Sequence, residues 1–242
     1  MNPARTEHRY AFAQSPCGGI ALALGETQVV LRASGALWLP AERMLIAADL
    51  HLEKGSAYAA RGQMLPPYDT RETLARLTAE AASLLPRTLV LLGDSFHDRK
   101  AEGRLAEEDI RPLTTIATVT QLIWVVGNHD ADGPATLPGD VVADWAAAGL
   151  RLVHEPMEGA RPGEVAGHLH PCARVKARAA SVRRRCFVTD GERLILPAFG
   201  AYAGGLNVMD VAFRPLFSRR PLTVALGDRR AHAVGWDSLG PD

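Results

Sequence analysis

Five short apolar runs in this chain end in residues that can bind a metal, and this repeated pattern constrains the fold more than any other feature. The runs lead into Asp49 and His51, into Asp94, into Asn128 and His129, into His154, and into His168 and His170. Six of the eight histidines lie at or next to these run ends, His97 being the sixth. Ligands in α/β proteins gather at the carboxyl ends of strands, so we expect the five segments to meet at one crevice.

The first run, MLIAADLHLEKG over residues 44–55, shows why a metal is expected there. A carboxylate at a buried strand end is unfavourable unless a positive charge lies beside it. Side chains alternate between the faces of a strand, so Asp49 and His51 are predicted to point to the same side. His168 and His170 have the same spacing, and Gly167 before them leaves room for close backbone approach. Taken alone, the first run also fits an ordinary strand exit, but the five runs together favour a metal site.

The order of the predicted elements indicates an α/β protein, because strands alternate with helices first and hairpins come last. No linker interrupts the pattern, so residues 1–242 are predicted to form a single domain. The predicted elements are hairpins over 19–40, a strand over 44–48, a helix from a capping box at Asp69 and Glu72 to Pro86, a helix over about 103–118, a helix over 141–149, a strand over 150–156 and hairpins from 174 onward.

Composition narrows the class of protein further. Apolar residues make up 47% and charged residues 22% of the 242, as in an ordinary globular protein. No apolar run approaches the length of a membrane span, the first residues lack a secretory signal, and three scattered cysteines suggest no disulfide frame. A cytoplasmic protein that has no membrane contact is therefore expected.

The net charge of zero hides an uneven distribution. Residues 1–159 carry six more acidic than basic residues, and residues 160–242 carry six more basic than acidic ones. The run RVKARAASVRRR over 174–185 contains six Lys and Arg and no acid. It predicts contacts of Arg183, Arg184 and Arg185 with the phosphates of DNA. A solvated basic strand face explains the run as well, and both interpretations stay open.

The ordered motifs carry a family resemblance. The series DLH, GDSFH, GNHD, a later His and GHLH resembles the signature of the calcineurin-like metallophosphoesterases. The segments ADLHLEKG, LLGDSFHD, AGHLHP and LPAFGAYAGGLNV resemble a narrower group, the ligase-associated DNA damage response endonucleases (PdeM), which are relatives of the SbcD nucleases. His97 departs from the broad family, where many members have a second Asp, but it matches the narrower group. The resemblance implies a four-layer α/β/β/α sandwich with two metals at one end of the two sheets.

The resemblance also implies a role for each motif residue. Asp49, His51 and His170 are expected to hold one metal, Asn128, His154 and His168 the other, and Asp94 both. Carboxylate, amide and imidazole ligands without thiolate favour Mn²⁺, with Fe or Zn²⁺ as alternatives. His129 is the expected acid for the leaving alkoxide and Asp130 its orienting partner, although His129 could also be a histidine that only supports the ligands. His97 is expected to contact substrate or ligands, or to lie on an exposed turn.

Together these features predict a dinuclear-metal phosphodiesterase, more specifically a DNA endonuclease linked to DNA repair. By resemblance, its partners would be DNA and a DNA ligase or helicase of a repair set. Two alternatives remain: a metal-dependent phosphatase or phosphodiesterase of small nucleotides, and a scaffold that kept the fold without catalysis. The presence of His129 argues against the scaffold, because scaffolds of this superfamily typically lose that histidine.

Overall fold

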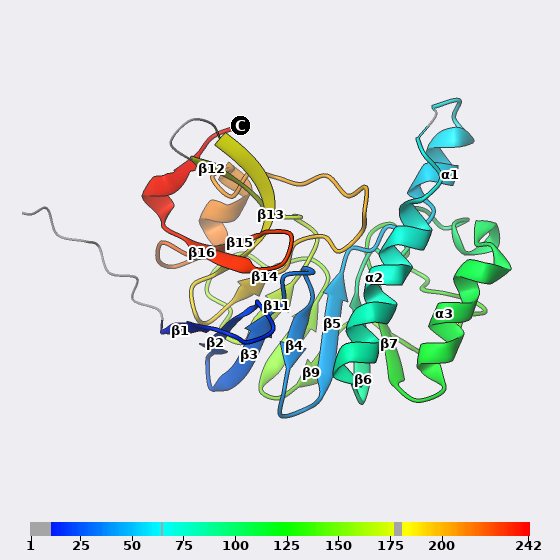
Figure 1. The fold of residues 1–242 in the computed structure, drawn as a ribbon, viewed down its shortest axis with the longest axis horizontal. Coiled ribbons are helices and arrows are strands. Elements are labelled where there is room, and N and C mark those ends of the chain that lie inside the picture. Colours follow the sequence, from blue (N-terminus) through cyan, green and yellow to red (C-terminus); the bar gives the residue numbers. More distant parts are fainter. Residues whose placement is uncertain (1–10, 64, 177–180) are drawn as a thin grey trace, which may run out of the picture.

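The computed structural model describes residues 11–63, 65–176 and 181–242, and its centre is a pair of β-sheets (Figure 1). In this part of the chain the first sheet contains eight strands in sequence order. Its first half is antiparallel, which confirms the hairpins predicted over 19–40. The antiparallel strands are β1 (Phe12–Gln14), β2 (Ile20–Leu24), β3 (Thr27–Leu31) and β4 (Leu37–Leu39).

The second half of the first sheet is parallel. Its strands are β5 (Met44–Ala48), β6 (Thr88–Leu92), β7 (Gln121–Val125) and β8 (Asp140–Val142). β5, β6 and β7 are apolar throughout most of their length because both faces of the sheet are covered. The helices α2 (Asp69–Leu84) and α3 (Glu107–Ala117) connect the parallel strands and pack on the outer face (Figure 1). A short helix, α1 (Lys54–Ala59), follows β5 directly.

The second sheet contains the hairpins predicted from residue 174 onward. Its main path, in spatial order, is β16 (Ala231–Val234), β15 (Leu222–Leu226), β13 (Ser181–Thr189), β14 (Leu194–Ile195), β11 (Glu164–Ala166), β10 (Leu150–Val153) and β9 (Trp145–Ala147). The long strand β13 also pairs with β12 (Cys172–Lys176), which pairs in turn with β17 (Leu239–Gly240). Three 3-10 helices complete the described elements: η1 (Glu102–Arg104), η2 (Val211–Leu216) and η3 (Trp236–Ser238).

Apolar side chains from both sheets form the main core between them. Ile46, Val90 and Ile123 of the first sheet belong to the same cluster as Val165 and Phe187 of the second. A second cluster joins the first sheet to α2 and α3 on its outer face. On the outer face of the second sheet, η2 packs against β11 and β14. The α/β class and the four-layer sandwich are therefore confirmed, and the fourth layer is the short 3-10 helix η2.

The helix predicted over 141–149 is wrong, because this segment forms the two edge strands β8 and β9. Its alanines favour a helix, but tertiary pairing overrides that preference. β8 pairs with β7 of the first sheet, and β9 pairs with β10 of the second. The glycines that flank the segment, Gly139 and Gly149, have φ values of 124° and 74° and turn the chain at both ends.

The capping box predicted for α2 is also wrong. The N-cap residue is Tyr68, and no side chain caps the helix. The Asp69 carboxylate instead accepts a hydrogen bond from the backbone N–H of Gly55, at 3.0 Å, and so ties α1 to α2. Its negative charge still lies in the first turn, where the helix dipole favours it. As predicted, the helix ends before Pro86, with Leu85 in a left-handed conformation.

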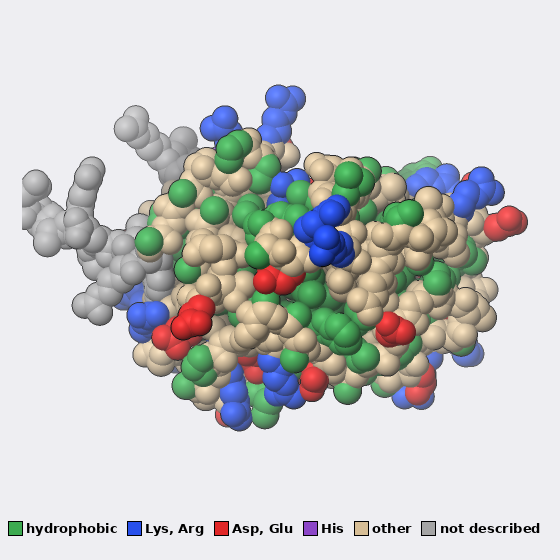
Figure 2. All heavy atoms as spheres, turned by 90° about the horizontal axis from the view of Figure 1, so that it is seen from below, with side chains coloured by type: hydrophobic (Ala, Val, Ile, Leu, Met, Phe, Trp, Pro, Cys, Tyr) green, Lys and Arg blue, Asp and Glu red, His purple; other side chains and the backbone are tan. Residues whose placement is uncertain are grey.

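The carboxyl ends of the parallel strands point upward in Figure 1, toward α1. Figure 2 shows the molecule from below, and no histidine side chain is visible on that face. In the part of the chain that the structure describes, histidines are thus not seen on the face at the amino ends of β5, β6 and β7. Within the described residues, no helix combines the length and the apolar character needed to cross a lipid bilayer.

Candidate metal centre

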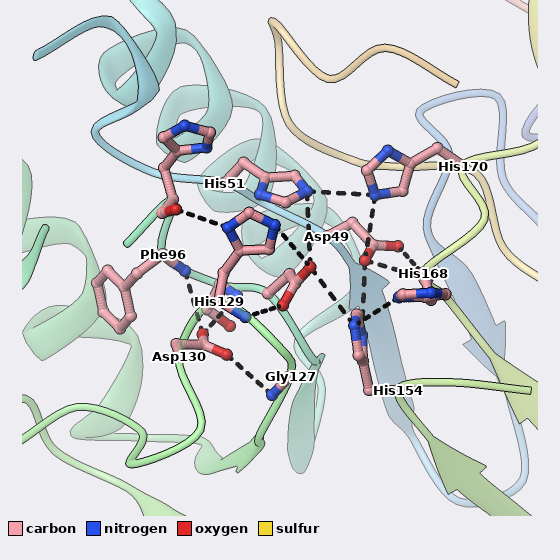
Figure 3. A network of polar contacts seen from close by, with 12 residues as sticks. Asp49, His51, Phe96, Gly127, His129, Asp130, His154, His168 and His170 are labelled. Carbon is pink, nitrogen blue, oxygen red and sulfur yellow. Dashed lines mark hydrogen bonds and ion pairs between the residues drawn. The ribbon is translucent and has the colours of Figure 1, made fainter. Parts of the chain in front are cut away.

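The candidate site lies where strands of both sheets end (Figure 3). Asp49 follows β5, Asp94 follows β6 and His154 follows β10. The sheets are joined at this point by a bridge between Ala48 and Ala198, and the N–H of Phe199 donates to the carbonyl of Ala48 at 2.7 Å. The crevice expected from the sequence therefore exists.

Five of the predicted ligands have a left-handed backbone conformation. The φ values are 54° for Asp49, 46° for His51, 43° for Asp94, 69° for His168 and 47° for His170. Such values are uncommon outside glycine and concentrate at functional sites. Asp49 and His51 do face the same group, as predicted, but strand alternation is not the cause, since β5 ends at Ala48. The chain turns sharply at each of these residues instead.

Asp49, His51 and His170 form the first donor group. Each offers one ligand atom, and the three atoms lie within 4.8 Å of one another. Asp49 Oδ1 lies 3.4 Å from His170 Nε2, and His51 Nε2 lies 3.2 Å from His170 Nε2 (Figure 3). Two imidazole nitrogens and a carboxylate oxygen thus converge on one point.

Asp94, His154 and His168 form the second donor group, with the same spacing. His154 Nε2 lies 3.4 Å from Asp94 Oδ2 and 3.1 Å from His168 Nδ1. Asn128 lines a cavity of about 360 Å³ together with His154, so it borders this group.

Asp94 stands between the two groups. Its Oδ2 lies 3.4 Å from His154 Nε2 and 4.0 Å from His51 Nε2, so one oxygen faces a histidine of each group. Its Oδ1 accepts a hydrogen bond of 2.9 Å from the backbone N–H of His129, which fixes the carboxylate plane. The Asp94 carboxylate is thus within reach of both donor groups.

The electrostatics of the site favour ligand-ready protonation states at Asp94 and His51, whereas the pKa of His154, although burial lowers it, is raised overall by its hydrogen bond to Asp94 and by the charge of Asp49. Burial raises the pKa of Asp94, but the hydrogen bonds from His154 and from the His129 backbone hold it well below its usual range overall. Burial, and then the neighbouring His170, lower the pKa of His51 to about 3, which keeps the imidazole neutral. An ionised carboxylate beside a neutral imidazole is the form that binds metals.

The residues present fit divalent cations. Asp49 and Asp94 are almost completely buried, and in the described residues their ion-pair partners are all histidines. A buried carboxylate without a full positive charge beside it is unfavourable. The buried Nδ1 atoms of His51 and His154 also lack hydrogen-bond partners. Oxygen and imidazole donors without thiolate suit Mn²⁺, Fe and Zn²⁺.

Two glycines make room for the donors. A Cβ at Gly93, whose φ is 71°, would lie 2.1 Å from His154 Nδ1. A Cβ at Gly167 would lie 2.5 Å from Asp49 Oδ2, which confirms the close approach predicted there.

The surroundings of His129 differ in part from the expectation. His129 Nδ1 lies 2.8 Å from the carbonyl oxygen of His97; because a carbonyl only accepts, Nδ1 carries the proton. Nε2 then faces Asp94 Oδ2 at 3.9 Å. The predicted orienting partner, Asp130, instead accepts backbone N–H bonds of 2.7 Å from Ser95 and 2.9 Å from Gly127. The His97 carbonyl thus orients the His129 ring, while Asp130 connects the loops that follow β6 and β7.

His97 and two residues that sequence reasoning missed lie around the donor groups. The half-buried His97 ring stacks on that of His129 at 5.5 Å between centroids. Lys54 Nζ donates to the carbonyl of Tyr202 at 3.0 Å, and its charge, after burial, lowers the pKa of His97. Glu155 Oε1 lies 3.9 Å from His168 Nε2. The only signal in the sequence that could have revealed Lys54 and Glu155 was their closeness to predicted ligands. Lys54 lies three residues after His51, and Glu155 directly follows His154.

The basic run separates into residues with different surroundings, and residues 177–180 lie outside the described structure. Arg185 donates to the carbonyls of Ala198 and Gly200, at 2.9 and 3.1 Å. Arg183 donates to the carbonyl of Gly205 and pairs with Asp242 at 3.1 Å. These two arginines therefore hold segment 198–206, whereas the exposed side chain of Arg184 has no hydrogen bond or ion pair to another described residue. The contacts of Arg183, Arg184 and Arg185 with DNA stay a prediction.

Comparison with known proteins adds family information to this geometry. The family described as Calcineurin-like phosphoesterase matches residues 42–191, a range that contains both donor groups. No curated protein matches the chain.

Three solved structures are similar to parts or most of the chain. Nuclease MPE from Pseudomonas putida is 28% identical, with a TM-score of 0.68, and the match covers 89% of this chain and 100% of that one. Yfce, a phosphoesterase from E. coli, is 15% identical, with a TM-score of 0.39 and coverage of 79% and 97%. A protein of unknown function from Aquifex aeolicus is 18% identical, with a TM-score of 0.36 and coverage of 57% and 81%.

Proposed function

Because this chain belongs to the calcineurin-like phosphoesterase family, we propose that it is a phosphodiesterase that cleaves DNA strands with two divalent cations. Membership of this family supports the assignment of the chain as a hydrolase that acts on phosphoester bonds. The observation that carries the finer proposal is the position of Asp94, whose Oδ2 faces His51 of one donor group and His154 of the other.

Two findings support DNA as the substrate. The similar protein from Pseudomonas putida is a nuclease, and the match extends over 89% of this chain. The motifs of this sequence also resemble those of ligase-associated DNA damage response endonucleases. We therefore place the proposed activity in DNA repair, with a DNA ligase or helicase as the expected partner.

The donor groups suggest how two cations are held. Asp49, His51 and His170 would hold one cation, Asn128, His154 and His168 would hold the other, and Asp94 would serve both. Mn²⁺ is the proposed metal, and Fe or Zn²⁺ also suit these ligands. When bound, the cations supply Lewis acidity toward the phosphoryl oxygens and a nucleophile derived from water at neutral pH.

The protein's own groups position the donors and handle the proton. The backbone N–H of His168 donates to both oxygens of Asp49, at 3.1 and 3.0 Å, and fixes that carboxylate. In its doubly protonated form, with a proton on each ring nitrogen, His129 gives the Nε2 proton to the leaving alkoxide and is left with the Nδ1 proton. Throughout this transfer, Nδ1–H keeps its bond to the His97 carbonyl, so the ring holds one orientation.

A substrate panel tests the proposal. The Mn²⁺-loaded protein is given a small chromogenic phosphodiester, the matching monoester and end-labelled single-stranded DNA. We expect hydrolysis of the diester and internal cuts in the DNA. Rapid turnover of the monoester or of small nucleotides with intact DNA would favour the small-substrate alternative. Two bound metals without hydrolysis of any substrate would contradict catalysis altogether.

A further inference from the structure

A second cavity, of about 380 Å³, lies outside the two donor groups, and four arginines are among the residues that line it. α2 contributes Arg76 to its wall, and β13 contributes Arg183, Arg184 and Arg185. A single carboxylate, that of Asp228 in the turn after β15, lines it as well. Four guanidinium groups around one cavity repel one another unless an anion lies among them.

The charges at this cavity are only partly neutralised within the protein. Burial, and after it the nearby charge of Arg185, lower the pKa of Arg76 to about 10, so two like charges lie close together. The negative charge of Glu72 acts in the other direction and raises the pKa of both Arg76 and Arg185. Asp242 pairs with Arg183 at 3.1 Å. Arg184 has no such partner among the described residues.

The guanidinium groups of Arg76 and Arg185 also have more N–H donors than acceptors that they contact. A guanidinium group has five N–H donors. Arg76 donates to the carbonyl of Phe199 through Nη2, while its buried Nε lacks a partner. Arg185 donates to the backbone through Nη1 alone. Free guanidinium donors in a fixed array suit the oxygens of phosphate, which arginine binds through two parallel bonds.

The cavity is close to the metal centre but separated from it by backbone. Arg185 donates to the carbonyl of Gly200, and the N–H of Gly200 donates to the carbonyl of Asp49 at 3.1 Å. One residue of segment 198–206 thus connects a cavity arginine to a proposed metal ligand. A strand that reaches both places would have one phosphate at the metals and a flanking phosphate at the arginines.

We propose that this cavity binds a backbone phosphate of the nucleic acid strand at a second site, distinct from the metal centre. The inference rests on the proposed function, since it assumes a strand as the substrate. It also selects among Arg183, Arg184 and Arg185, because only the side chain of Arg184 makes no hydrogen bond or ion pair to another residue in the described part of the chain.

Opposite charge changes at the cavity give a direct test. The full chain loaded with Mn²⁺ is titrated into a fluorescent phosphorothioate oligonucleotide, which keeps the backbone charge and slows cleavage, and anisotropy is followed at several salt concentrations. Arg184→Gln should weaken binding several-fold and reduce the log–log salt slope by about 0.7, the value for one lost contact to a single strand. Asp228→Asn should strengthen binding and steepen the slope, because it removes the carboxylate that lines the cavity.

Arg111→Gln on α3 is the matched control. Arg111 is exposed on another face and its side chain has no ion pair or hydrogen bond in the described structure, so this variant should bind like the parent protein. Arg184 and Asp228 are also exposed, and thermal unfolding checks that each variant folds. Equal salt slopes for Arg184→Gln and Arg111→Gln would overturn the inference, as would weaker binding by Asp228→Asn.

A second arm distinguishes a strand phosphate from free phosphate. If inorganic phosphate stabilises the parent against heat but not Arg184→Gln, while both bind the oligonucleotide alike, the cavity takes a free anion and the strand proposal is overturned. Failure of the proposed function has a different signature. In that case the oligonucleotide binding would depend on Arg184 and Asp228, yet no phosphodiester would be cleaved with any metal.

Discussion

Asp94 is the residue on which both donor groups depend. Its Oδ1 is fixed by the N–H of His129, and its Oδ2 is directed at histidines of both groups. Asp94→Asn keeps the size of the side chain but removes its negative charge. We expect it to abolish turnover and to empty at least one metal position, measured by elemental analysis of the purified variant. Asp132→Asn, at an exposed position, should retain both metals and full activity. Full activity with two metals in Asp94→Asn would exclude the bridging role.

His129 allows a test that separates proton transfer from metal binding. His129→Ala should keep both metals and slow the cleavage of a diester with a poor leaving group by about 10²–10⁴, the usual effect of a positioned acid. The loss should shrink for a chromogenic diester, whose leaving group needs no proton. His232→Ala, on the exposed side of β16, is the control. Equal losses for good and poor leaving groups would argue against the acid role.

At the scale of elements, segment 198–206 links the second sheet to the metal-binding strand ends. Arg185 holds its carbonyls from one side, and Gly200 bonds to Asp49 from the other. Arg185→Gln should lower the free energy of unfolding by about 2 kcal/mol, the scale of a lost charge-assisted hydrogen bond, as measured with denaturant. It should also weaken Mn²⁺ binding, because the segment supports Asp49. Arg184→Gln, one residue away, should change neither quantity, and equal effects of the two variants would refute the supporting role.

The elements also show what the sequence could and could not reveal. The parallel strands were predictable because β5, β6 and β7 are apolar runs that end in polar ligands. The left-handed turns at Asp49 and His168 were not, since neither residue is a glycine and contacts between distant segments stabilise them. The alanines of 141–149 suggested a helix because of their high helix propensity, although β9 forms a hairpin with β10, which follows it directly in sequence. The roles of Asp130 and Arg185 depend on backbone groups that no side-chain pattern reports.

For the whole molecule, the donors come from both sheets, so bound metal should act as a cross-link between them. Asp49, His51 and Asp94 follow strands of the first sheet, whereas His154, His168 and His170 follow strands of the second. A cation that binds only the folded state stabilises it by about 2.7 kcal/mol at one hundred times its dissociation constant. Adding Mn²⁺ to chelator-treated protein should therefore raise the melting temperature. The increase should be smaller in Asp94→Asn, and an unchanged melting temperature in the parent would contradict a site shared by the sheets.

The division of the donors between the sheets also determines when a newly made chain can become a catalyst. A chain that has emerged from the ribosome as far as residue 160 contains Asp49, Asp94 and His154, but His168 and His170 have not yet been added. Segment 198–206 and strand β15 of the second sheet follow later still. Growing chains therefore carry an incomplete set of ligands until His170 has been added. Translation itself thus delays hydrolysis of phosphoester bonds until strands of both sheets have been made.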